Sequence, residues 1–180
     1  RLTNTYIHSA DDLFATIKKY QIDCQARQNG WLRVFHSAKV LRKEEVCLKE
    51  WNNHGAGIEF VGRSEIERKS GTSAYHSGII TPQGGAVQPL SLSRGLAKAA
   101  EQRGVKIYSK SAVLSLDKSE GKWTAKTSIG SVLSDWVIIA TNGYTGDLIP
   151  GLSKSIIPIA SIQIATDPLP EETIGSILPE

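Results

Sequence analysis

Methionine is absent from this sequence of 180 residues, and cysteine occurs only twice. Because the initiator methionine is absent, we expect the chain to be a piece of a longer polypeptide, although processing would also remove that residue. Cys24 and Cys47 do not have the spacing of a metal site, and two cysteines are too few for a disulfide scaffold. We therefore expect free thiols in a reducing compartment, and a cytoplasmic location.

Long hydrophobic runs are also absent. None approaches the roughly 20 residues that a membrane helix needs, and the first residues contain no apolar signal-peptide segment. The excess of positive charge is small, because 21 lysines and arginines stand against 18 aspartates and glutamates, a formal net charge of +3. Such an excess, scattered along the chain, does not predict nucleic-acid binding. We expect neither a membrane span nor a nucleic-acid partner.

Common catalytic and metal-binding motifs are missing as well. The sequence contains no G-x-G-x-x-G, P-loop, H-E-x-x-H or C-x-x-C, and no serine lies in a nucleophile elbow. The histidines are far apart and lack the spacing of metal ligands: His8, His36, His54 and His76. The motifs therefore predict no metal site and identify no catalytic residue.

What the sequence does contain is one short apolar run followed by a turn of small residues, D-W-V-I-I-A-T-N-G-Y at residues 135–144. Val137–Ala140 shows no polar alternation, which favours a parallel strand covered on both faces. Ligands of open α/β sheets bind beyond the carboxyl ends of such strands, so Thr141–Gly143 is a candidate site. The alternative is a plain Asn-Gly hairpin turn, but residues 144–150 show no returning strand.

Periodicity predicts a mixed α/β fold, which is α+β within these 180 residues. The predicted helices begin near Ser9, Ala38 and Arg63 and just after Pro89, with Ser9 and Ser91 as N-caps and Gly104 as a C-cap. Strands are predicted at residues 31–35, 58–61, 78–81, 105–108, 112–116, 122–127, 131–133, 137–140 and 156–165.

Several blocks, taken in order, resemble a known family. Residues 75–100 read Y-H-S-G-I-I-T-P-Q-G-G-A-V-Q-P-L-x-L-x-R-G-L-A-K-A-A, and residues 140–152 read A-T-N-G-Y-T-G-D-L-I-P-G-L. P-I-A-S-I-Q-I-A-T-D-P-L follows at 158–169, and G-W-L-R-V precedes them at 30–34. Together they resemble FAD-dependent oxidoreductases of the D-amino acid oxidase class, in the gamma-glutamylputrescine oxidase-like branch. The resemblance spans nearly the whole chain.

The resemblance implies a partial FAD-binding domain interleaved with a partial substrate domain. Residues 1–29 and 76–145 would belong to the FAD side, and residues 30–75 and 146–180 to the substrate side. The family's G-x-G-x-x-G turn, which holds the FAD pyrophosphate, is missing. We therefore expect an internal segment of a longer flavoprotein, inactive by itself.

The same resemblance places cofactor contacts at six residues: Gln88, Val113, Ala140, Thr141, Asn142 and Gly143. Val113 would meet the adenine part of FAD through its backbone, although its side chain alone is equally well interpreted as core. The four residues of 140–143 would lie along the cofactor, and Gln88 near the flavin ring. Many relatives have histidine at the Gln88 position, so this chain lacks the protonatable side chain that those relatives place near the flavin ring. Ser77 likewise replaces a common glycine.

The implied reaction is oxidation of a small amine or amino-acid-like substrate. A hydride passes from the amine-bearing carbon to FAD, and water hydrolyses the resulting imine. Oxidase and dehydrogenase remain alternatives, as do relatives that oxidise sarcosine or glycerol phosphate. A stand-alone binding domain without redox chemistry is the competing hypothesis. The sequence does not identify the amine or the oligomeric state.

Overall fold

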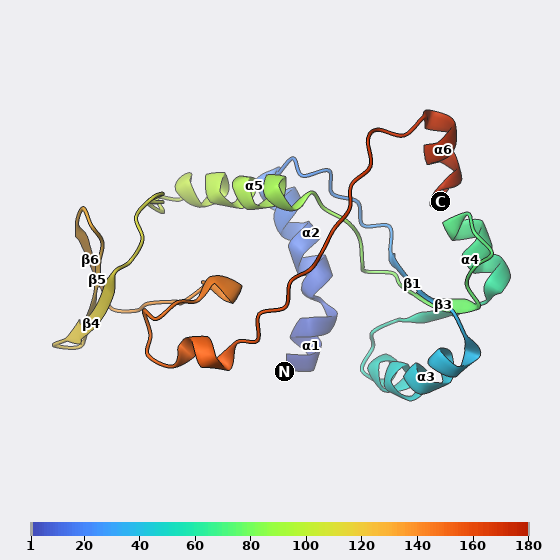
Figure 1. Cartoon of the computed structure of the whole chain (residues 1–180), viewed down its shortest axis with the longest axis horizontal. Helices are drawn as coiled ribbons and strands as arrows, with labels where there is room; N and C mark the ends of the chain where they lie inside the picture. The colour runs from blue at the N-terminus through green and yellow to red at the C-terminus, as the bar shows by residue number, and fades with distance from the viewer. Residues whose placement is uncertain (1, 180) are drawn as a thin grey trace. The chain divides into compact units, whose positions relative to one another are not determined.

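A computed structural model describes residues 2–179 and divides the chain into two compact units (Figure 1). The first unit runs up to Val105 and resumes at Thr166, whereas the second consists of Lys106–Ala165. Both contain an antiparallel three-stranded sheet. The prediction of mixed helices and sheets is thus confirmed. None of the helices within residues 2–179 is both long and apolar enough to cross a membrane.

The first unit contains six helices and three strands among the described residues. The helices are α1 (Leu2–Ile7), α2 (Ser9–Tyr20), α3 (Ala38–Asn53), α4 (Arg63–Ser70), α5 (Pro89–Glu101) and α6 (Glu171–Ser176). The strands are β1 (Trp31–Phe35), β2 (Glu59–Val61) and β3 (Ser77–Thr81), in the sheet order β1-β3-β2. The predicted helices and strands of this unit are confirmed to within a residue or two.

Helices pack against both faces of the first sheet. Successive side chains of a strand point to opposite faces, so neighbouring residues of β3 meet different helices. Ile79 of β3 joins Phe35 and Leu48 of α3 in a buried cluster. The adjacent residue, Gly78, faces the other way, where a Cβ atom would lie 2.7 Å from Cδ1 of Ile66 in α4. Ile66 is fully buried at this contact. Glycine at position 78 therefore lets α4 pack directly against the strand.

A second core of this unit lies where α2 meets α5 (Figure 1). Ile17, Ile22 and Cys24 are buried there, and Leu92 of α5 packs against them. A side chain at Gly95 would collide with Ile22. The close approach of α5 to the end of α2 depends on this glycine.

Both predicted N-caps are wrong, although the helices themselves form. The residue before α2 is His8, and the hydroxyl of Ser9 instead donates to the carbonyl of Tyr6 at 2.8 Å. The N-cap of α5 is Gln88, whose Oε1 accepts from the backbone N–H of Ser91 at 2.5 Å. The helix starts earlier than predicted because proline is well suited to the first helical position, where its missing N–H is not needed.

The C-cap of α5 is Gln102 and not the predicted Gly104, but Gly104 ends the turn that follows the helix. Gly104 has φ +87°, the left-handed region that glycine enters without strain. The Val105 N–H donates to the carbonyl of Ala100 at 3.1 Å, which satisfies a carbonyl group at the end of the helix.

The second unit is built on the sheet β4 (Ser115–Ser119), β5 (Lys122–Lys126) and β6 (Ser131–Ser134), in that order. Glu120 and Gly121 join β4 to β5 with φ angles of 51° and 81°, as a two-residue hairpin requires. Two short 3-10 turns follow, η1 (Asn142–Tyr144) and η2 (Leu152–Ser155). The predicted meander is confirmed. Its first strand, β4, begins at Ser115, three residues after the predicted start at residue 112.

Three predicted strands do not form among the described residues: 105–108, 137–140 and 156–165. The prediction that Val137–Ala140 is buried is also wrong, since the side chain of Ile138 is 89 % exposed. Ile164 is 93 % exposed in the same way. These segments have strand-forming sequences, but a strand needs a neighbour to pair with its backbone N–H and C=O groups. Within the described part of the chain no strand pairs with them.

Candidate functional site

The turn predicted to bind the cofactor follows the extended segment 137–140 directly. The N–H of Tyr144 donates to the carbonyl of Thr141 at 3.0 Å, and the hydroxyls of Thr141 and Thr145 lie 2.6 Å apart. Asn142 has φ +48°, a conformation that asparagine tolerates better than most residues. Gly143 does not adopt a positive φ. The left-handed residue of the turn is therefore Asn142 and not the glycine.

The side of the turn at Gly143 is open. A Cβ atom built on Gly143 would meet no atom within 4 Å. Among the hydrogen bonds of residues 2–179, none involves the N–H of Ala140 or Thr141. These groups can therefore donate to a ligand that approaches the chain closely. The predicted residues 140–143 fit a cofactor edge in this respect.

The two other predicted site residues lie elsewhere. Val113 precedes β4 in the second unit, and its side chain is 39 % exposed, so it is not a core residue here. Gln88 belongs to the first unit, where its N–H donates to the carbonyl of Cys24 at 2.8 Å and its side chain caps α5. The structure gives Gln88 a structural role that the sequence did not predict.

A cavity of about 340 Å³ lies in the first unit, at residues that the sequence did not single out. Its walls come from α1, the start of α2, the sheet and α3. Three aromatic side chains line it, Tyr6, Trp31 and Trp51. Sequence reasoning missed it because its residues come from four separate segments. One usable signal was the alternation of Trp31 and Arg33 in the predicted strand 31–35, which places both on one face.

The polar side chains that line this cavity, here called the aromatic pocket, include Arg33 of β1, Thr81 of β3, Gln83 in the loop after β3 and Ser9 of α2. Nη2 of Arg33 lies 3.3 Å from Oε2 of Glu44, and both side chains are partly exposed. Another hollow of about 450 Å³ lies between the end of α2 and α5. Its lining includes the exposed side chains of Arg94 and Lys98.

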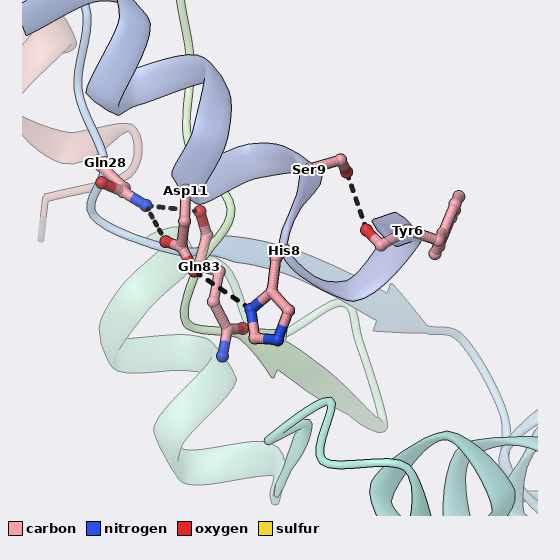
Figure 2. A network of polar contacts seen from close by, with 6 residues as sticks. All are labelled: Tyr6, His8, Ser9, Asp11, Gln28 and Gln83. Atoms are coloured by element: carbon pink, nitrogen blue, oxygen red, sulfur yellow. Dashed lines mark hydrogen bonds and ion pairs between the residues drawn. The ribbon is translucent and has the colours of Figure 1, made fainter. Parts of the chain in front are cut away.

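A network of polar contacts fixes one edge of the aromatic pocket (Figure 2). Nε2 of Gln28 donates to Oδ1 of Asp11 at 2.7 Å and to the carbonyl of Gln83 at 3.1 Å. This ties the first turn of α2 to the loop after β3. Nδ1 of His8 lies 4.0 Å from Oδ2 of Asp11, too far for a hydrogen bond. The network therefore positions the pocket edge, and its geometry does not form a proton relay.

Comparison with protein families gives a match along nearly the whole chain. The model of the family described as "DAO: FAD dependent oxidoreductase" matches residues 1–179. The gamma-glutamylputrescine oxidoreductase of Escherichia coli K12 is 32 % identical over 166 residues, which cover 91 % of this chain and 38 % of the relative. The probable oxidoreductase OrdL of Haemophilus influenzae is 27 % identical, covering 99 % and 42 %.

Solved structures with the same fold agree with this match. L-proline dehydrogenase from P. horikoshii superposes with a TM-score of 0.68 at 16 % identity, over 77 % of this chain and 38 % of its own. Glycine oxidase from Geobacillus kaustophilus gives a TM-score of 0.65 at 17 % identity, over 86 % and 41 %. At such identities the likeness concerns the fold. The chain spans about two fifths of the length of the relatives it matches.

Proposed function

Because the chain belongs to the FAD-dependent oxidoreductase family, we propose that it is part of a longer enzyme that oxidises an amine or an amino-acid-like substrate. The family and its cofactor, FAD, agree with what the sequence resemblance implied. The observation that carries the substrate proposal is the 32 % identity to gamma-glutamylputrescine oxidoreductase over 91 % of this chain. The relatives' greater length supports the view that other segments complete the enzyme.

Residues 140–143 are proposed to meet FAD because the structure leaves backbone groups there open. The N–H groups of Ala140 and Thr141 are available as donors, and Gly143 leaves room beside the chain. Val113 would contribute backbone contacts, and Gln88 would act through the start of α5. When bound, FAD supplies the redox chemistry by accepting a hydride from the amine-bearing carbon. No residue of this chain is assigned as a general acid or base.

We propose the same division into domains that the family resemblance implies. Residues 1–29 and 76–145 are assigned to the FAD side, and residues 30–75 and 146–180 to the substrate side. In the structure β1 pairs with β3, so one sheet bridges the proposed boundary near residue 76. We also propose a cytoplasmic location, which the two free cysteines support.

The test of this function uses the longer protein that carries the chain. After purification with added FAD it should show the visible absorption of a bound flavin, and an amine or amino acid should bleach that absorption under anaerobic conditions. A protein without any flavin spectrum would favour the alternative of a binding domain without redox chemistry. Reduction by glycerol phosphate alone would replace the amine with a different substrate class.

The proposed cofactor edge is tested by Gly143→Val in the same longer protein. The turn around Gly143 is open and has an ordinary backbone, so the melting temperature of the apoprotein should hardly change. The dissociation constant for FAD should rise, because the added side chain occupies the space proposed for the cofactor. A variant with unchanged FAD affinity would show that residues 140–143 are only a structural turn.

A further inference from the structure

We propose that the aromatic pocket of the first unit binds an organic carboxylate with an apolar body. Its volume of about 340 Å³ falls within the range of small-molecule sites, which combine apolar walls with a few converging polar groups. The proposal does not depend on the redox function, because binding is measured on the chain itself.

The single charged residue of the lining favours a ligand with an anionic end group. Arg33 is the single charged residue among the described residues of the lining, which include neither aspartate nor glutamate. An ammonium group in the pocket would therefore face a cation with no counter-charge from the lining. A carboxylate, by contrast, matches the planar guanidinium and can accept two of its N–H groups at once.

The sheet register places further donors beside Arg33. Arg33 lies opposite Ile79 and Trp31 opposite Thr81, so all four residues share one face of the sheet. The hydroxyl of Thr81 and the side-chain amide of Gln83 make no hydrogen bond within residues 2–179. The ion pair between Arg33 and Glu44 at 3.3 Å engages only one Nη of the guanidinium, which has five N–H donors. The guanidinium, whose Cζ lies 5.4 Å from the centroid of the Phe35 ring, thus keeps N–H donors for a carboxylate, and Thr81 and Gln83 line the same pocket.

The other walls are suited to an apolar body. The rings of Tyr6 and Trp51 lie 5.3 Å apart with a tilt of 35°, and the buried side chains of Leu48 and Ile79 form the base. Aromatic side chains of this kind offer a large apolar contact area. The pocket should therefore prefer an aryl or alkyl carboxylate over the amine of the same shape.

The tryptophans of the chain allow a direct measurement. Trp31 and Trp51 line the pocket, whereas Trp123 and Trp136 belong to the second unit. In the full 180-residue chain, the double substitution W123F/W136F leaves only the pocket tryptophans as fluorescent reporters. Titration with 4-phenylbutyrate should change their emission, with at least tenfold tighter binding than 4-phenylbutylamine and than 4-phenylbutanol. Equal affinity for the amine, or no response to any of the three probes, would overturn the proposal.

Two substitutions with opposite expected effects separate a binding role from a structural one. Arg33→Gln should weaken 4-phenylbutyrate binding about tenfold or more, as expected for losing a charged hydrogen bond. Glu44→Gln should tighten it, because Arg33 loses its competing partner; a destabilised fold would not produce tighter binding. Arg42→Gln, on the exposed surface of α3 outside the pocket, is the matched control and should have no effect. Unchanged affinity in the Arg33 variant, or weaker binding in the Glu44 variant, would refute the assignment.

Discussion

Gly84 is the residue that lets Trp31 reach the wall of the aromatic pocket. A Cβ atom at this position would lie 2.6 Å from Cβ of Trp31 and 3.1 Å from the carbonyl oxygen of Thr81. Neither neighbour is the flexible end of a side chain, so Gly84→Ala should displace the strand or the loop. We expect a loss of about 1–3 kcal/mol of unfolding free energy, the usual cost of overpacking. Urea denaturation of both proteins in the W123F/W136F background, followed by the fluorescence of Trp31 and Trp51, measures it.

Gly175→Ala is the matched control for this prediction. It adds the same methyl group to α6 of the same unit, where no atom lies within 4 Å of the new Cβ. Alanine also favours a helix over glycine by roughly 1 kcal/mol, so stability should be unchanged or slightly higher. Equal losses of unfolding free energy in the two variants would mean that the loss in Gly84→Ala does not come from the close contacts around position 84.

At the same scale, the candidate site was only partly predictable. The sequence pointed to residues 140–143 because a small-residue turn after an apolar run is a local pattern. The left-handed residue proved to be Asn142, since both asparagine and glycine can adopt that conformation and the pattern does not distinguish them. The pocket around Arg33 and Trp51 depends on contacts between distant segments, which no local pattern encodes.

Among the elements, the hairpin of β4 and β5 carries a pH-dependent contact. Oδ2 of Asp117 lies 3.2 Å from Nζ of Lys126, and the Ser115 hydroxyl donates to the same oxygen at 3.2 Å. The hydrogen bond and the charge of Lys126 lower the pKa of Asp117 below its ordinary 3.8. A lowered folded-state pKa adds stability above the ordinary pKa, and this contribution is lost as the pH falls through the lowered value.

Asp117→Asn should therefore reduce the dependence of the melting temperature on pH below about 4, with wild type and variant converging in acid. The effect is small because both partners are exposed, and about 0.5 M salt should weaken it further. Melting curves of wild type and variant between neutral and acidic pH test this. A constant difference between the two proteins at every pH would rule out a contribution from the ionised carboxylate.

The elements also show where prediction from sequence succeeds. Helices such as α2 and α5 obey the local rule of periodicity, and the hairpin at Glu120 and Gly121 obeys that of turn chemistry, so their positions were predicted closely although the caps were not. The segments 137–140 and 156–165 have equally clear strand sequences, yet they remain unpaired among the described residues. A strand is a property of two segments, and the sequence of one does not supply its partner.

For the molecule as a whole, these two unpaired segments give a measurable prediction. Their backbone N–H groups lack strand partners in this chain, so their amide hydrogens should exchange rapidly, unlike those of β5. In the longer protein proposed above, we expect the same amides to exchange more slowly by several orders of magnitude, because other segments would pair with them. Hydrogen exchange followed by mass spectrometry on both proteins tests this. Equal rates in the two proteins would contradict the proposal that outside segments complete a sheet here.

The return of the chain to the first unit has a consequence for its synthesis. The Leu178 N–H donates to the carbonyl of Ser70 at 3.4 Å, so the segment after Thr166 contacts the end of α4. A ribosome translates Lys106–Ala165 before it reaches this segment. The second unit therefore leaves the exit tunnel and can fold while the first still lacks α6. During translation, the end of α4 stays uncovered until the whole second unit has been made.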